Sequence, residues 1–449
     1  MPDLPRPNIV SAMMCMPRAT PPQFVTVAIC LSIVVVDGFD ILSISFVAPA
    51  IADEWALTPI ELGSVFSAGL AGMALGAFVL SSVGDILGRR TAIMIFLLVI
   101  GTGMLLTASA DRLMTLSSYR LLTGLGIGAL VSNTCTILVE SVLPARRATF
   151  LGIVLLGTPV GALLSGSVAL FLIDRGGWRA VFAAGGFLSL ALIPVVLAGL
   201  REPAELPIDR SLRRRFRGPL VGHEAPRPSS RLPSDERARP AVDLFGVLRG
   251  RQLRTTILFG LIHFIYMFAF YAVVNWITKL TKESIASDSV SISIAMLINV
   301  GGIAGLLSAG VPARQFGLVN ATAGGFLLIA LSLFTFGGMP GVLPLLAFGA
   351  ALIGGAFFVT QVNLFALLAA SYPARVRATA VGITFGIGRV GSVLGPYLAG
   401  ALVQWGVGKL PLFLLLAVPQ VIAAAMVRRI PPNGELLPDP GAPGTMNVH

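Results

Sequence analysis

Residues 24–50 read FVTVAICLSIVVVDGFDILSISFVAPA, and only two of these side chains, Asp37 and Asp40, are acidic or basic. A helix needs about 20 mostly apolar residues to cross the hydrocarbon core of a membrane. The stretch therefore predicts a membrane-spanning helix. The whole chain has the same character, because 55% of its 449 residues are hydrophobic and 12% are charged. Soluble domains carry about a quarter charged residues, so the composition predicts an all-α polytopic membrane protein.

Twelve apolar stretches are long enough to span a membrane, and they fall into two sets of six. The first set covers about 24–50, 61–83, 92–110, 114–140, 149–172 and 179–200, and the second about 254–278, 289–310, 317–337, 341–370, 378–403 and 410–427. Between them lies a polar segment rich in arginine and proline. We expect five parts: an N-terminal tail (1–23), a six-helix bundle (24–200), a linker (201–253), a second six-helix bundle (254–427) and a C-terminal tail (428–449).

Two distant segments resemble each other and indicate an internal duplication. Residues 144–149 read PARRAT and residues 373–379 read PARVRAT, so that their prolines lie 229 positions apart. Gly88 and Gly317 have the same separation, while Gly161 and Gly391 lie 230 apart. Each pair falls at the same place within its six-span unit. The sequence thus predicts twelve transmembrane helices in two pseudo-symmetric six-helix bundles, an architecture that many transporters use, with the substrate site between the repeats.

The basic residues are distributed unevenly between the two sides of the predicted membrane. With an N-terminus in the cytoplasm, the cytoplasmic segments hold the linker arginines and eleven others: Arg6, Arg18, Arg89, Arg90, Arg146, Arg147, Arg314, Arg375, Arg377, Arg428 and Arg429. The external loops hold six: Arg112, Arg175, Arg179, Lys279, Lys282 and Lys409. Because positive charge favours the cytoplasmic side, we expect both termini there. The net charge of +11 then faces lipid headgroups and not nucleic acid.

The chain shows no pattern typical of an enzyme or of a cofactor site. Its three cysteines, Cys15, Cys30 and Cys135, have no paired spacing, so we expect neither a disulfide framework nor a metal site. A phosphate-binding glycine loop with its lysine is also missing. The sequence predicts no cofactor, and transport driven by the chain's own ATP hydrolysis is not expected.

Ionisable groups within membrane helices are costly and by default indicate function. Asp37 and Asp40 lie three residues apart, on one helix face near mid-membrane, and are candidates for proton coupling. Arg120 and Arg389 are permanent cations inside the fourth and eleventh spans. Arg120 needs an anion, which is either Asp37, Asp40 or a substrate carboxylate. Arg389 has no comparably placed acid in its own half, so we predict that it binds a substrate carboxylate by paired hydrogen bonds. A structural ion pair is the alternative for both arginines.

Other polar side chains within spans are candidates for the substrate site: Asn133, Asn275, Gln361, Asn363 and Tyr271. Hydrogen bonding between helices is the commoner role for any one of the amides. His263 is the single histidine within the predicted spans, and packing is its commoner role. Aromatic residues available to wall an apolar site are Phe39, Tyr266, Phe270, Tyr271 and Trp276.

Several of these motifs resemble those of a known family. Residues 84–90, GDILGRR, are similar to the loop signature of the major facilitator superfamily, and Arg120 with Gly124, Gly126 and Gly128 resembles its fourth-span signature. The Asp37-Gly38-Phe39-Asp40 motif and residues 388–396, GRVGSVLGP, resemble the aromatic acid/proton symporters of bacteria. The resemblance implies that the span-1 acids and the membrane arginines take part in transport. It also implies a gating loop built from Asp85, Gly88, Arg89 and Arg90.

The resemblance implies a proton-coupled importer of small aromatic carboxylates, of benzoate or hydroxybenzoate type, in a bacterial inner membrane. Protons, the substrate and the bilayer are then its partners, and we expect a monomer. Within transporters, the alternatives are a symporter for another organic acid and a drug/proton antiporter. Outside them, a membrane sensor predicts a larger cytoplasmic module than the linker, and a lipid-modifying enzyme predicts long external loops that the chain lacks.

Overall fold

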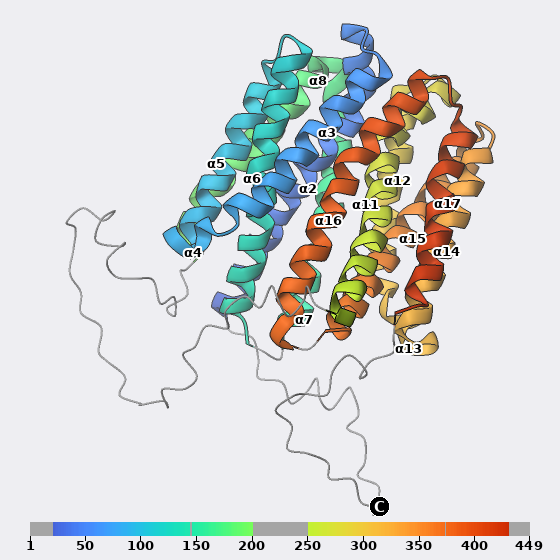
Figure 1. Cartoon of the computed structure of the whole chain (residues 1–449). Coiled ribbons are helices and arrows are strands. Elements are labelled where there is room, and N and C mark those ends of the chain that lie inside the picture. Colours follow the sequence, from blue (N-terminus) through green and yellow to red (C-terminus); the bar gives the residue numbers. More distant parts are fainter. Residues whose placement is uncertain (1–20, 144–145, 201–249, 373, 431–449) are drawn as a thin grey trace, which may run out of the picture.

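The computed structural model describes residues 21–143, 146–200, 250–372 and 374–430, which form helices without any strand. Figure 1 shows two groups of roughly parallel helices lying side by side. The first group contains α2 (Pro21–Trp55), α3 (Pro59–Leu75), the π-helix η1 (Gly76–Leu80), α4 (Val83–Leu87), α5 (Arg89–Ala108), α6 (Leu113–Ser141), α7 (Arg147–Leu155) and α8 (Gly157–Gly199). The second contains α11 (Gly250–Ile285), α12 (Asp288–Ser308), α13 (Gly310–Phe316), α14 (Leu318–Gly338), α15 (Leu343–Ala370), α16 (Ala374–Gln404) and α17 (Lys409–Val427).

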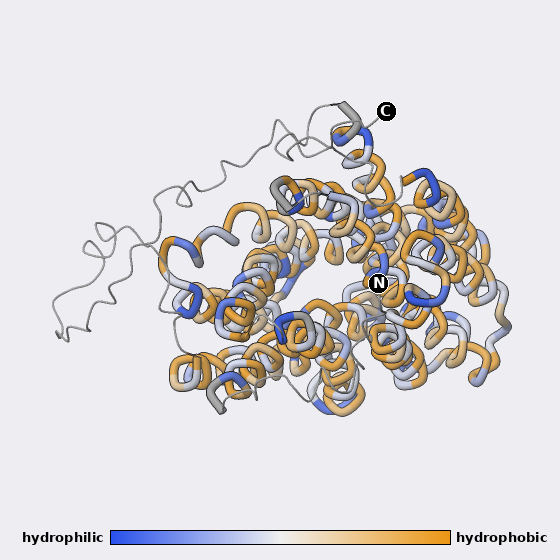
Figure 2. The backbone as a smooth tube through the Cα atoms, turned by 90° about the horizontal axis from the view of Figure 1, so that it is seen from below, coloured by the Kyte–Doolittle hydropathy of each residue, from blue (hydrophilic) through white to orange (hydrophobic). Residues whose placement is uncertain are grey.

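Eleven helical stretches in the described residues are long and apolar enough to cross a membrane. The longest, Thr149–Gly199, reverses direction at Gly177, whose φ of 67° and ψ of −177° are not helical. It therefore crosses twice, and the twelve-helix fold predicted from hydropathy is confirmed. Figure 2, a view along the helices, shows that apolar residues predominate over polar ones along the helices. The predicted boundaries of the five parts of the chain stay a prediction, and the greater part of the linker lies outside the described residues.

The duplication is visible in two equivalent bends of the backbone. Gly88 (φ 93°) and Gly317 (φ 78°) each follow a short helix, α4 or α13, and each caps the start of the next long helix, α5 or α14. A positive φ is accessible to glycine at little cost and is unfavourable for residues with a Cβ atom. The two halves thus use the same residue for the same turn, 229 positions apart.

Close helix crossings repeat in the same way. A Cβ atom added at Gly72 would lie 2.2 Å from the Leu121 carbonyl oxygen, and one at Gly301 would lie 1.8 Å from the Ala351 carbonyl oxygen. The contacts of Gly161 with Val35 and of Gly391 with Phe264 are also equivalent, at 1.9 and 2.4 Å from the carbonyl oxygens. Small residues let membrane helices approach this closely. Each half is therefore assembled around matching glycine contacts.

The two halves meet where α2 faces α11. The Ser45 hydroxyl donates to the Val274 carbonyl at 2.5 Å, and Lys282 Nζ lies 2.7 Å from Asp53 Oδ2. Both contacts join residues that are 229 positions apart, which are the same positions of the two repeats. Contact between equivalent positions is what a twofold axis produces for the residues beside it. The helices α2 and α11 thus flank the pseudo-twofold axis.

A continuous seam between α3 and α16 joins the halves at one end of the molecule. This end, which carries Trp55 and the Gly177 bend, is called the Trp55 end; the opposite end, with α4, α7 and α13, is called the Arg89 end (Figure 1). Along the seam the Ile60 amide donates to Gln404 Oε1 at 3.1 Å, and the Ser67 hydroxyl donates to the Val393 carbonyl at 2.6 Å. The seam then reaches Arg389, which donates to the sulfur of Met73. The contacts run from the Trp55 end to the middle of the bundle.

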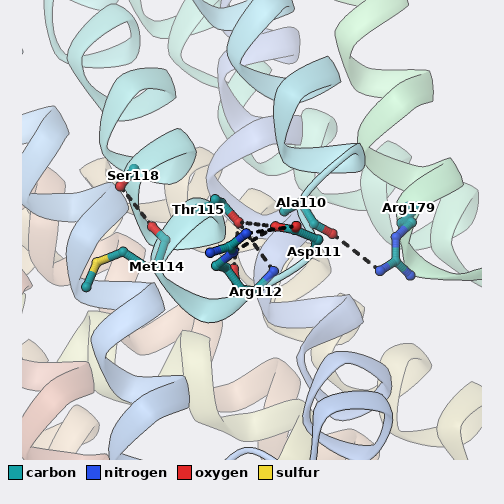
Figure 3. A network of polar contacts seen from close by, with 7 residues as sticks. All are labelled: Ala110, Asp111, Arg112, Met114, Thr115, Ser118 and Arg179. Carbon is teal, nitrogen blue, oxygen red and sulfur yellow. Dashed lines mark hydrogen bonds and ion pairs between the residues drawn. The ribbon is translucent and has the colours of Figure 1, made fainter.

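Polar contacts tie the helix ends of the first half together at the Trp55 end. Arg179 Nη1 donates to Glu54 Oε1 at 2.7 Å. Figure 3 shows the second contact of this guanidinium, in which Nη2 donates to the Ala110 carbonyl at 3.3 Å. In the turn between α5 and α6, hydrogen bonds from Arg112 and Thr115 hold the pKa of the Asp111 carboxyl below its usual value. These contacts fix the positions of α2, α5, α6 and α8 relative to one another along their axes.

The glycine crossings give a prediction about stability. A Cβ atom at Gly128 would lie 2.0 Å from the Met73 carbonyl oxygen, whereas nothing lies within 4 Å of one at Gly152. Because α3 and α6 must separate to admit a methyl group, we expect Gly128→Ala to destabilise the protein by roughly 1–3 kcal/mol, as overpacking does. Thermal unfolding of the purified protein in detergent measures this. Gly152→Ala is the control, and equal melting temperatures for the two variants would show that the crossing is looser than described.

Candidate functional site

A buried ion pair joins α2 to α6. Arg120 Nη1 lies 2.6 Å from Asp40 Oδ1, and Arg120 Nη2 donates to the Asp40 carbonyl oxygen at 3.2 Å. The two side chains are 4% and 0% exposed. Among the anions that the sequence offered to Arg120, the structure therefore selects Asp40. Removing one member of such a pair leaves an uncompensated buried charge, which costs about 3–5 kcal/mol.

The second acid of α2 is placed differently. Asp37 is buried, and its Oδ1 has no hydrogen-bond partner in the part of the chain that the structure describes. It lies one helical turn before Asp40 and within electrostatic range of Arg389 on the opposite half. The two neighbouring carboxylates thus have different environments. Asp40 is held by a cation of its own half, while Asp37 forms no ion pair among the described residues and lies within electrostatic range of a cation of the other half.

Arg389 lies between the halves at the inner limit of the α3–α16 seam. Its Nη1 donates to the Met73 sulfur of α3, and the Tyr271 hydroxyl of α11 is within hydrogen-bonding reach. A thioether is a weak acceptor, and a guanidinium has five N–H donors. No carboxylate lies within ion-pair distance of Arg389 among the described residues. The guanidinium therefore retains capacity to bind an anion.

Helix α15 carries two further polar residues of the predicted substrate site, Gln361 and Asn363. The rings of Phe365 on α15 and Phe385 on α16 lie 5.8 Å apart. Gln361, which is partly buried, lies one turn before Phe365 on α15, and Arg389 lies one turn after Phe385 on α16. Asn363, also on α15, is buried and its Nδ2 lacks a partner in the described structure. Asn275 donates to the Tyr271 carbonyl at 2.9 Å within α11.

The predicted gating loop forms a compact polar cluster at the Arg89 end. Arg89 donates to Asp85 Oδ1 at 2.5 Å and to Asn133 Oδ1 at 3.1 Å, and its Nε lies 3.9 Å from Glu140. Arg90 donates to the Leu197 carbonyl of α8. Asn133, which we expected beside the substrate, instead binds the loop and donates to the Ser81 carbonyl at 3.3 Å. The sequence indicates how deep Asn133 lies in its span but not which residue its side chain contacts.

Two features of this arrangement were not predicted. Met73 is an uncharged residue among many apolar ones, so nothing in the sequence identifies it as the neighbour of Arg389. Lys282 was counted only as a charge of an external loop, yet it binds both Asp53 and Asp288, each at 2.7 Å. The signal available for Lys282 was the presence of acids at the ends of the neighbouring spans.

A small pocket between α2, α11 and α12 is lined by residues that include Ser45, Val274 and Asn299.

Comparison with known proteins now identifies the family. The model of the Major Facilitator Superfamily matches residues 29–396, which is most of the chain. The protein belongs to the Major Facilitator Superfamily. It is thus a membrane transporter and not an enzyme, as the loop and span motifs predicted.

The relatives of this major facilitator include named transporters of similar length. A gallate transporter of Pseudomonas putida is 31% identical, and the alignment covers 90% of this chain and 91% of that protein. A 4-hydroxybenzoate transporter of Pseudomonas aeruginosa is 28% identical, covering 91% and 92%. Among solved structures, a D-xylose–proton symporter superimposes with a TM-score of 0.71 at 15% identity, covering 91% and 98%. The likeness to that structure supports the fold alone.

Proposed function

We propose that this major facilitator imports small aromatic carboxylates together with protons. The observation that carries the proposal is the position of Arg389, a membrane cation between the two halves with donors available for an anion. Its surroundings include Tyr271 and the aromatic pair Phe365 and Phe385, which suit a flat apolar ring. The named substrates of the relatives, gallate and 4-hydroxybenzoate, are aromatic acids of this kind.

The proposed coupling uses competition for Arg389. When Asp37 is charged, it attracts the guanidinium and opposes a second anion beside it. When Asp37 binds a proton, this competition ends and the substrate carboxylate takes its place. The Asp40–Arg120 pair holds the part of α2 that carries Asp37. Proton and carboxylate would thus enter the site together, which is symport.

The proposed alternating access uses the contacts between the halves. In the described state the α3–α16 seam and the Lys282–Asp53 pair join the halves at the Trp55 end. Entry of substrate from that side requires these contacts to break. The Asp85–Arg89 cluster is the proposed gate at the other end, where Asp85 is 62% exposed in this state.

The proposed location is the bacterial inner membrane, with the Arg89 end and both termini in the cytoplasm. The loop charges support this orientation. Reporter fusions after Arg254 and at the C-terminus should therefore report cytoplasm, and a fusion near Lys282 should report the external side. A C-terminal reporter active only outside the cell would overturn the orientation.

Uptake into proteoliposomes tests the proposed function. With a lower pH outside, labelled 4-hydroxybenzoate should accumulate inside above its external concentration, and a protonophore should abolish this accumulation. Excess unlabelled benzoate should compete, whereas benzamide should not. Accumulation driven only by the opposite pH gradient would indicate an antiporter. Proton-driven uptake of aliphatic acids that aromatic acids do not inhibit would leave symport in place and contradict the substrate class.

A further inference from the structure

A buried histidine packs against α16 at Gly388, the residue before Arg389, and has no role in the proposed mechanism so far. His263 of α11 is 3% exposed, and its Nε2 has no hydrogen-bond partner in the described residues. The imidazole rests on the backbone of α16, where a Cβ atom added at Gly388 would lie 2.0 Å from its Cδ2. Its ring centre lies 4.5 Å from that of Phe385. The imidazole thus contacts both Gly388, the neighbour of Arg389, and Phe385.

A second polar atom on α16 is also left without a partner. Thr384 is 1% exposed, and its hydroxyl makes no hydrogen bond within the described structure. Threonine in a helix commonly donates to the carbonyl four residues earlier, as Thr360 does to Ala356 at 2.7 Å. Thr384 precedes Gly388 by four residues, so it lies on the same face of α16, the face packed against α11.

Two buried polar groups without partners are costly unless something satisfies them. Both lie on the interface of α11 and α16: His263 packs against Gly388, the residue before Arg389, and Thr384 lies five residues before Arg389. An imidazole carries a donor and an acceptor in its uncharged form, and a hydroxyl is likewise both. A phenolic hydroxyl matches this pair, because it also donates one hydrogen bond and accepts others.

We propose that His263 and Thr384 form a subsite that binds the ring hydroxyl of a hydroxylated aromatic acid, while Arg389 binds its carboxylate. The subsite rests on the proposed function and adds a preference to it: the protein selects hydroxybenzoates over benzoate. Phe385 packs on the imidazole of His263 and on the ring of Phe365, and it lies one turn before Arg389 on α16. His263 is therefore a specificity-determining residue, and the ring hydroxyl is the group that it binds.

The experiment compares the dissociation constants of 4-hydroxybenzoate, 3-hydroxybenzoate and benzoate for the purified full-length protein. In the wild type at least one hydroxybenzoate should bind about tenfold or more tightly than benzoate, because a site built to pair with a hydroxyl rejects the analogue without it. His263→Phe keeps an aromatic ring against Phe385 and removes the nitrogens. Thr384→Val removes only the hydroxyl. The selectivity ratio is the dissociation constant of benzoate divided by that of the preferred hydroxybenzoate. Each variant should reduce this ratio several-fold, chiefly through weaker hydroxybenzoate binding.

Two glycines of α16 supply a matched pair of variants. Gly388→Ala should displace the imidazole and reduce the same ratio, whereas Gly386→Ala, with nothing within 4 Å of the added methyl group, should leave it at the wild-type value. Measurable benzoate binding shows that each variant is folded.

The outcomes separate the subsite from the function that it deepens. If His263→Phe and Thr384→Val both keep the wild-type ratio while benzoate still binds, the subsite is wrong and the proposed function stands. A wild type that prefers benzoate over both hydroxybenzoates overturns the subsite as well. If no aromatic acid binds the wild type, the proposed function fails and the subsite fails with it.

Discussion

Replacing Arg389 by alanine is expected to weaken the binding of benzoate on the order of a hundredfold. Losing one partner of a desolvated charge pair costs about 2–5 kcal/mol, and each 1.4 kcal/mol is a factor of ten. Benzamide has the same ring without the charge, so its weak binding should change little. Arg389→Lys restores the charge but not the planar pair of donors, so it should recover the affinity only in part. Equilibrium binding to purified protein measures all three effects.

The neighbouring residue supplies the control for this prediction. Val390, the next residue along α16, is uncharged and 53% exposed, so Val390→Ala should bind benzoate as the wild type does. If Arg389→Ala weakens benzoate and benzamide equally, the arginine supports the fold of the seam with Met73. If it weakens neither, the carboxylate binds elsewhere. Either result removes Arg389 from the substrate site.

The substitution Asp40→Asn is expected to abolish concentrative uptake and to destabilise the protein. The substitution leaves Arg120 buried without its counter-charge, a loss of about 3–5 kcal/mol. The double variant Asp40→Asn/Arg120→Gln removes both charges, so it should recover much of the thermal stability. It should not recover uptake, because the pair that fixes the Asp37 segment is gone. Thermal unfolding and pH-driven uptake, measured on the same preparations, distinguish the two effects.

Asp37→Asn should separate binding from coupling. This variant lacks the group that competes for Arg389, so we expect it to bind and exchange benzoate across the membrane without accumulating it. Counterflow in proteoliposomes measures the exchange. Full concentrative uptake by Asp37→Asn/Asp40→Asn would show that neither acid takes part in coupling.

Hydropathy and spacing were sufficient to predict the fold of this chain. Each span satisfies its own backbone hydrogen bonds, so its existence depends on local composition and can be recognised without knowledge of the partners. The repeat was readable because equivalent turns require the same residue, as Gly88 and Gly317 illustrate. The reversal at Gly177 takes a single residue, where the sequence suggested a loop of several residues between 172 and 179.

Partner choice could not be predicted in the same way. Asp37 and Asp40 share a helix face, and only the rotation of α2 against α6 decides that Arg120 binds Asp40. Asn133 lies within a membrane span, but its side chain accepts a hydrogen bond from Arg89 of the gating loop. Likewise the contact of Arg389 with Met73 depends on the closure of the α3–α16 seam. These details are set by helix packing, which hydropathy does not encode.

The central claim, that proton and aromatic carboxylate move together through one site, is tested most directly by proton flux. Proteoliposomes containing the protein and an internal pH-sensitive dye are exposed to an external step of 4-hydroxybenzoate, with equal pH on both sides and no membrane potential. The account predicts internal acidification beyond that of protein-free liposomes, lost in Asp37→Asn and Arg389→Ala. Carrier-mediated entry of the labelled acid without any such acidification, or with alkalinisation, would contradict it.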